Sequence, residues 1–235
     1  MANETKAQIR AEIRRDLRDP INTTTNNGIT WSNSELDDLI NSGIDAISDL
    51  SPIETTEDNV YVFPNYSGQN IGVPLEIVPT TDFKNIFRVD ILDTAGRYYE
   101  TLPIYNDSRW GNGWQWFGGK VILPSGYSYP VEKFTQSGNE YERVNVRIWG
   151  YKRHEQLTTD GASSDLTTAE KNAVKIYVQA EALSRLMIDR ADFQQWQIAS
   201  GATNMTISEL SVLASSARTR WRMEMQRLRK FRQIG

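Results

Sequence analysis

The sequence predicts an α+β protein, in which a helical bundle of about four helices carries an inserted antiparallel β-sandwich or small barrel. Three observations predict this class. Apolar residues recur at helical spacing towards both ends of the chain, short alternating runs fill its middle, and capping sequences precede several helices. We expect the N-terminal part of the helical body at 1–57, the β domain at 58–152, a linker and helix at 153–205, and a long basic helix at 206–235.

The first predicted helix covers about residues 4–17. Apolar side chains recur along it at steps of four, and Pro20 stops it. A row of cations follows the same steps, and we expect this row to be a solvated face balanced by nearby acids. The row comprises Lys6, Arg10, Arg14 and Arg18.

The second helix begins at a run that marks a helix N-terminus in two ways. Ser32 is placed to cap the backbone N–H of Glu35, whose carboxylate reaches back to the Ser32 N–H. Trp31 and Leu36 flank this capping box at the positions of a hydrophobic staple. We therefore predict a helix over 33–50. Its apolar face comprises Leu36, Leu39, Ile40, Ile44, Ile47 and Leu50.

The middle of the chain changes to the spacing of β-strands. Short β-branched or alternating runs are separated there by clusters of Gly, Pro and Asn. Six to eight short strands without helical patterns between them predict antiparallel sheets. The clearest runs are 60–63, 75–78, 87–92 and 144–149.

Helical spacing returns after a polar linker. Thr167 and Glu170 form a second capping box, and the helix behind it has a stripe wide enough for burial among several helices. Thr206 and Glu209 repeat the pattern before a last helix over 207–232, which would be about 39 Å long.

This last helix is apolar on one face and strongly basic. Residues 206–235 carry seven basic and two acidic side chains, a net charge of +5, whereas the other 205 residues carry −9. We expect its distal half to leave its own core and to dock on a negative partner, either protein or nucleic acid. The apolar stripe favours a protein groove with an acidic rim over contacts with phosphates. The stripe comprises Leu210, Leu213, Ala217, Trp221, Met225, Leu228 and Phe231.

The residues that most often carry chemistry are scarce. The chain has no cysteine, which excludes disulfides and thiolate sites, and its one histidine, His154, is expected at a surface or interface. We predict no catalytic, cofactor-binding or metal site. No run approaches the roughly 18 apolar residues of a membrane span, and the N-terminus lacks a signal-peptide pattern. We expect a soluble protein without a membrane partner, kept in a reducing interior.

Aromatic residues are concentrated in the β region. Of 24 aromatic residues, 13 lie between residues 98 and 151. Trp114 and Trp116 would share a strand face and, with Trp110, could form a tail interface or a ligand platform. The alternative is a β-domain core or a subunit interface. A carbohydrate-binding or host-adhesion module is therefore the competing function.

Four segments together resemble a known family. They are residues 9–20, residues 30–41, residues 177–183 and the long arginine-rich last helix, and they lie in the predicted helical body, which makes up a little over half of the chain. The chain resembles the head-to-tail adaptor (connector, or head-completion) proteins of tailed bacteriophages. The central β region departs from the many small helical members of that family.

The resemblance implies a non-enzymatic virion protein of the particle's neck, made in the host cytoplasm. Such proteins form rings, typically of twelve subunits, beneath the portal protein. They receive a tail or nozzle protein on the other face, close to the packaged DNA in the channel. Their final helices typically reach onto the portal. We therefore expect the partner-binding residues to be Arg218, Trp221, Arg222, Leu228, Arg229 and Phe231.

Overall fold

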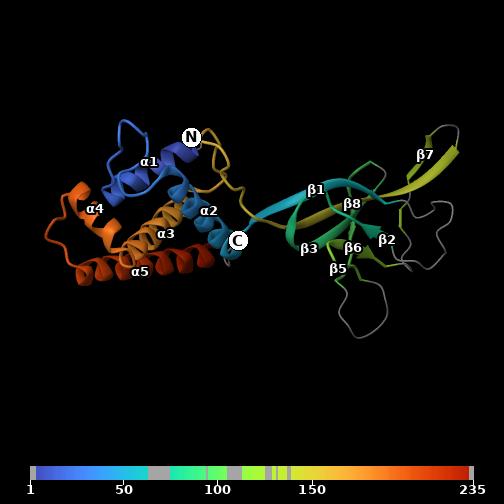
Figure 1. The fold of residues 1–235 in the computed structure, drawn as a ribbon. Helices are drawn as coiled ribbons and strands as arrows, with labels where there is room; N and C mark the ends of the chain where they lie inside the picture. The colour runs from blue at the N-terminus through green and yellow to red at the C-terminus, as the bar shows by residue number, and fades with distance from the viewer. Residues whose placement is uncertain are drawn as a thin grey trace. The chain divides into compact units, whose positions relative to one another are not determined.

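The computed structural model describes residues 4–62, 75–93, 95–104, 113–124, 129–130, 132–136 and 139–232. This part of the chain contains five helices and antiparallel sheets, with no closed barrel, so the predicted α+β class is confirmed (Figure 1). The chain divides into two compact units. The helical unit comprises Met1–Pro52 and His154–Gly235, and the β unit comprises Ile53–Arg153.

The helical unit contains all five helices of the described residues. They are α1 (Lys6–Leu17), α2 (Asn33–Leu50), α3 (Thr168–Leu186), α4 (Arg190–Ser200) and α5 (Ile207–Arg232). Helix α4 is an addition to the four predicted helices. Asp189 caps it by accepting the N–H groups of Ala191 and Asp192, and its buried side chains are Phe193 and Trp196. The cap lacks the Ser/Thr-x-x-Glu/Gln pattern that marks the other helix starts.

The predicted capping boxes are all present. Ser32 Oγ accepts the Glu35 N–H at 3.2 Å, and a Glu35 carboxylate oxygen accepts the Ser32 N–H at 2.8 Å. The same exchange occurs between Thr167 and Glu170 before α3, and between Thr206 and Glu209 before α5. Each box satisfies backbone donors that the first helical turn leaves unpaired.

The core of the helical unit is formed where the apolar stripes of the helices meet. It includes buried side chains of α1, α2, α3 and α5 together with Trp31. The predicted apolar face of α2 is almost entirely buried in this core, because five of its six side chains are at most 3% exposed. These are Leu36, Leu39, Ile40, Ile44 and Ile47.

The cationic row of α1 is buried, and its prediction as a solvated face is wrong. Lys6, Arg10 and Arg14 are 6%, 8% and 4% exposed, whereas Arg18 is exposed at the C-cap. Carboxylates outside α1 neutralise the three buried cations. Asp37 of α2 contacts Lys6 at 3.0 Å and Arg10 at 2.8 Å. Further partners are Asp160 for Arg10 and Asp19 for Arg14.

The β unit consists of a five-stranded and a three-stranded antiparallel sheet. The first has the order β1-β8-β3-β4, with β7 also paired to β8, and the second has the order β2-β6-β5. The strands are β1 (Ile53–Val62), β2 (Leu75–Ile77), β3 (Phe83–Leu92), β4 (Tyr98–Thr101), β5 (Gln115–Phe117), β6 (Lys120–Leu123), β7 (Glu132–Gln136) and β8 (Asn139–Lys152).

Both sheets contribute to one hydrophobic core. Val89 and Val146 of the larger sheet lie in the same cluster as Val121 and Leu123 of the smaller one. The unit begins earlier than residue 58, because β1 already pairs with β8 at Ile53, opposite Lys152. The predicted boundary therefore falls inside β1.

Candidate protein-docking surface

Helix α5 packs along α3 and completes the core of its own unit (Figure 1). Met225 and Leu228 are 4% and 9% exposed in that core. The half-buried Trp221 ring packs against Tyr177 of α3, with ring centroids 5.4 Å apart. The prediction that Leu228 anchors a partner is therefore wrong, because the chain buries this side chain in its own core, and the Trp221 ring is partly covered by the same chain. The side chain of Phe231 lies outside the described residues.

Leu228→Ala should accordingly destabilise the isolated chain. Removing this buried side chain is expected to lower the free energy of unfolding by about 2 kcal/mol. Urea unfolding of the purified chain measures the loss, with Gln226→Ala on the exposed side of α5 as the control. Equal stability of both variants and wild type would restore Leu228 as a free docking anchor.

The exposed arginines of α5 form two rows on opposite sides of the helix. At 100° per residue, Arg218, Arg222 and Arg229 lie within about 40° of one another, and we call them the first arginine row. Arg220 and Arg227 lie within about 20° of each other on the other side and form the second row.

Few carboxylates neutralise the first arginine row. Arg222 and Arg229 make no ion pair with any residue that the structure describes, and Arg218 lies 3.5 Å from Glu181 in an exposed pair. Between the two rows, the outward side of α5 exposes Val212 and Met223, which are 66% and 57% exposed. The predicted basic surface of α5 is therefore present. The exposed apolar side chains beside it are Val212 and Met223, and not Trp221 and Leu228 as predicted.

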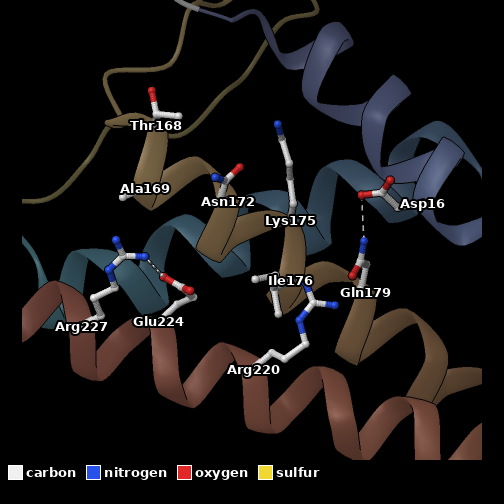
Figure 2. Close-up of a pocket in the computed structure, with 10 residues that line it drawn as sticks. All are labelled: Asp16, Thr168, Ala169, Asn172, Lys175, Ile176, Gln179, Arg220, Glu224 and Arg227. Carbon is white, nitrogen blue, oxygen red and sulfur yellow. Dashed lines mark hydrogen bonds and ion pairs between the residues drawn. The ribbon is translucent and has the colours of Figure 1, made fainter.

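A groove runs beside α5, and its first section is lined by both charged and polar groups. This cavity of about 530 Å³ lies between α5, α3 and the end of α1 (Figure 2). Arg220 and Arg227 enter it from α5, and Gln179 of α3 donates to Asp16 of α1 at 2.9 Å. Figure 2 shows Lys175 pointing away from α5; its ammonium pairs with Glu12 and Glu4.

The groove continues into an apolar section. A cavity of about 410 Å³ shares Asp16, Gln179 and Arg220 with the first section, and a third cavity of about 590 Å³ shares Leu213 and Met205 with the second. The apolar lining of the middle cavity comprises Leu17, Leu183, Trp196, Ala202, Met205, Leu213 and Ala217. We call these three neighbouring cavities, taken together, the α5 groove.

The dimensions of the α5 groove suit a segment of another protein. Its lining follows α5 from Glu209 to Arg227, about 27 Å at 1.5 Å per residue. An apolar floor with charged groups at intervals is the arrangement that receives an amphipathic helix. Sequence reasoning missed this groove because its walls come from α1, α3 and the α4–α5 connection.

His154 is buried in the helical unit, so its expected surface or interface position is wrong. The ring is held between two oxygen atoms: Nδ1 lies 3.1 Å from Asp165 Oδ1, and Nε2 lies 2.9 Å from the Ser51 carbonyl oxygen. The His154 N–H also donates to Ser48 Oγ at 2.9 Å. These bonds join the chain on both sides of the β insertion to the end of α2.

Glu170 completes this buried polar cluster. Burial alone would raise the pKa of its carboxyl group, but hydrogen bonds from Thr167 and Ser51 and the nearby His154 ring together lower that pKa below its ordinary value. The Ser51 hydroxyl donates to Glu170 Oε1 at 2.7 Å. The Glu170 carboxylate thus serves as a structural acceptor between α2 and α3.

The tryptophans expected to form a ligand platform take different positions. Trp114 is 2% exposed in the β core, and the half-buried Trp116 packs against the same core. Trp110 lies outside the described residues. Trp114 is therefore unavailable for stacking on a sugar, and Trp116 is partly covered.

Two further searches cover the described residues. They contain no group of three or more His, Asp or Glu side chains placed to hold a metal ion. None of their helices has the length and apolarity needed to cross a bilayer.

No family model matches the chain, and no curated protein matches it.

Proposed function

We propose that this chain is a virion structural protein that forms an adaptor ring between the portal vertex of the capsid and the tail of a tailed bacteriophage. The sequence resemblance supports this proposal, as does a helical unit in which every predicted capping box forms. The ring, of twelve subunits, belongs to the neck of the virion. It acts without enzymatic chemistry and encloses the channel through which the packaged DNA passes.

The α5 groove is the observation that carries the proposal. The portal protein contributes a segment with apolar side chains for the section around Leu213 and carboxylates for Arg220 and Arg227. Burial of the apolar side chains supplies most of the affinity, and the arginines orient the segment. This mode of docking replaces the one based on Trp221 and Leu228, whose side chains stabilise the fold.

The β unit carries the contact with the tail or nozzle protein. Three of its aromatic side chains, Tyr98, Tyr99 and Phe117, are 56%, 55% and 74% exposed, and exposed rings are common anchors of protein interfaces. We also propose that its two sheets, which share one core, are the two layers of the predicted β-sandwich.

Leu213→Arg tests portal docking. Leu213 is 43% exposed and lines two sections of the groove, so the added charge is tolerated in the free chain and must be buried on binding. We expect binding to a purified portal ring of the same virus to weaken by at least about tenfold, measured by co-sedimentation.

Met223→Arg is the matched control, because it places the same side chain on the outward side of α5, where Met223 is 57% exposed. It should bind the portal ring as wild type does. Equal binding by both variants would refute the groove as the docking site. Failure of the wild-type chain to bind any portal ring would refute the proposed function itself.

A further inference from the structure

The class of partner that the first arginine row can bind depends on which side chains of α5 remain available. On sequence alone, the apolar stripe of α5 favoured a protein groove over phosphates. In the structure Met225 and Leu228 of that stripe are buried in the core of the helical unit, and Trp221 packs against Tyr177. These side chains stabilise the fold, so the side chains beside the first arginine row decide the class of partner.

The side of α5 that carries the first arginine row has no acidic and no apolar side chain. At 100° per residue, the row and five further residues of α5 fall within a sector of about 100° that begins at Arg218. Glu209 and Glu224, the acidic residues of α5, lie at least about 120° from Arg218. We call this part of the surface the basic sector. Besides the three arginines it comprises Ser208, Ser211, Ser215, Thr219 and Gln226.

The arginines of the basic sector are open to a partner, because all three are exposed. Arg222 and Arg229 make no ion pair with any residue that the structure describes. The side chains of Arg218 and Glu181, which lie 3.5 Å apart, are 51% and 35% exposed. An exposed pair of this kind contributes little energy, so Arg218 can exchange Glu181 for another anion at small cost. An anionic partner therefore meets three available guanidinium groups.

The side chains of the basic sector are of the types that contact phosphate groups. Arginine, serine, threonine and glutamine all donate hydrogen bonds to the phosphate oxygens of nucleic acids. Arg218 and Arg229 are about 16 Å apart along the helix axis, and one strand of duplex DNA carries about five phosphates over that length. A protein partner, in contrast, needs apolar side chains at the centre of the contact, and the basic sector has none.

We propose that the basic sector of α5 binds the phosphate backbone of duplex DNA. Arg222 and Arg229 neutralise phosphates, and Arg218 joins them by exchanging Glu181 for a phosphate. The hydroxyl and amide groups of the sector donate to further phosphate oxygens. Because the contact is with the backbone, it does not depend on the base sequence.

The basic sector and the α5 groove lie on different sides of α5. Arg220 and Arg227 of the second arginine row line the groove. A portal segment in the groove therefore leaves the basic sector free to contact DNA. This contact deepens the proposed function and rests on it for its place in the virion, where the basic sector faces the DNA channel.

Fluorescence anisotropy of labelled 20-bp DNA duplexes, titrated with the full chain at about 50 mM salt, tests the contact. Between about 50 and about 200 mM salt the affinity of the wild type should fall by at least about tenfold, because two free arginines release counterions from the DNA. Arg222→Gln with Arg229→Gln should weaken binding by at least about tenfold at 50 mM salt and remove most of this salt dependence. Two duplexes of unrelated sequence should bind equally.

Arg220→Gln with Arg227→Gln is the matched control, because it removes the same charge from the second arginine row. It should weaken DNA binding by less than about threefold, since these side chains lie away from the DNA. Circular dichroism checks that each variant is folded.

The contact would be overturned by a wild-type chain that does not bind DNA at 50 mM salt, by equal affinities of the two variants, or by unequal binding of the two duplexes. Loss of portal binding by Arg222→Gln with Arg229→Gln, with DNA binding unchanged, would make the row a protein contact and overturn the proposal as well. The DNA measurement contains no portal ring, so a negative result leaves the Leu213→Arg test of portal docking unaffected.

Discussion

Replacement of Asp19 by alanine should lower the free energy of unfolding by about 4 kcal/mol, because it leaves a buried guanidinium without its counter-ion. Asp19 is 3% exposed and Arg14 is 4% exposed, and their side chains form an ion pair. The second Asp19 oxygen accepts the Thr30 N–H at 2.9 Å. The change therefore removes both a charge partner and an anchor of the loop before α2.

The surroundings of Arg14 explain the expected size of the effect. Burial lowers the pKa of this guanidinium, and the charge of Asp19 opposes that shift. Arg14 also donates to the Trp31 carbonyl oxygen at 3.0 Å and to Asn33 Oδ1 at 2.7 Å, but neither partner carries a charge. Without Asp19, these two neutral hydrogen-bond acceptors do not offset the cost of burying the Arg14 charge.

Urea unfolding at pH 7 measures this loss. Asp16→Ala removes an exposed carboxylate from α1, the helix that carries Arg14, and should cost less than about 1 kcal/mol. Combining Asp19→Leu with Arg14→Leu should cost less than Asp19→Ala alone, because no unpaired charge is left in the core. If Asp19→Ala and Asp16→Ala are equally stable, the buried pair does not have the proposed role.

Glu170→Gln is expected to destabilise the protein by about 3 kcal/mol at pH 7. Glu170 is 4% exposed, and its carboxylate accepts the Thr167 N–H at 2.9 Å and the Ser51 hydroxyl at 2.7 Å. The amide can replace only part of these bonds, because one of its two terminal atoms is a donor.

The difference between wild type and Glu170→Gln should depend on pH. The folded-state pKa of Glu170 is lowered from the ordinary 4.5, so the unfolded state binds the proton more readily. The stabilisation is therefore complete above about pH 4.5 and is lost as the pH falls through the lower folded-state pKa. Urea unfolding of both proteins from pH 7 to pH 3 should show the difference shrinking with acidification.

Glu35→Gln is the matched control, since Glu35 occupies the same capping position on α2 and is exposed. It should cost less than about 1 kcal/mol at pH 7. A Glu170→Gln penalty that is the same at pH 7 and pH 3 would show that the carboxylate charge does not contribute.

The parts of the fold that follow from local chemistry were predictable from the sequence. The box of Thr167 and Glu170 joins residues three positions apart, so the pattern alone specifies the helix start. The burial of Arg10 was not predictable in this way, because its partners Asp37 and Asp160 are 27 and 150 residues away. A cation that is paired across the core and one that faces water have the same helical spacing.

For the candidate site, too, the sequence predicted local patterns but not the tertiary contacts that decide which side chains are covered. The apolar stripe of α5 was visible in the sequence, but a stripe does not reveal whether Tyr177 of the same chain or a residue of another protein covers Trp221. Likewise, alternation placed Trp114 and Trp116 on one face of a strand without showing that this face is the core. The α5 groove depends on tertiary packing and had no local signal.

The β unit is attached to the helices through neighbouring backbones, because its first residue, Ile53, pairs with Lys152, next to its last residue. Paired strands lie about 5 Å apart, so the helical unit only has to accommodate that short span. Length changes at the far loops leave the span unaltered. During evolution such a stem allows the insertion to be exchanged as a unit while the helical scaffold is kept.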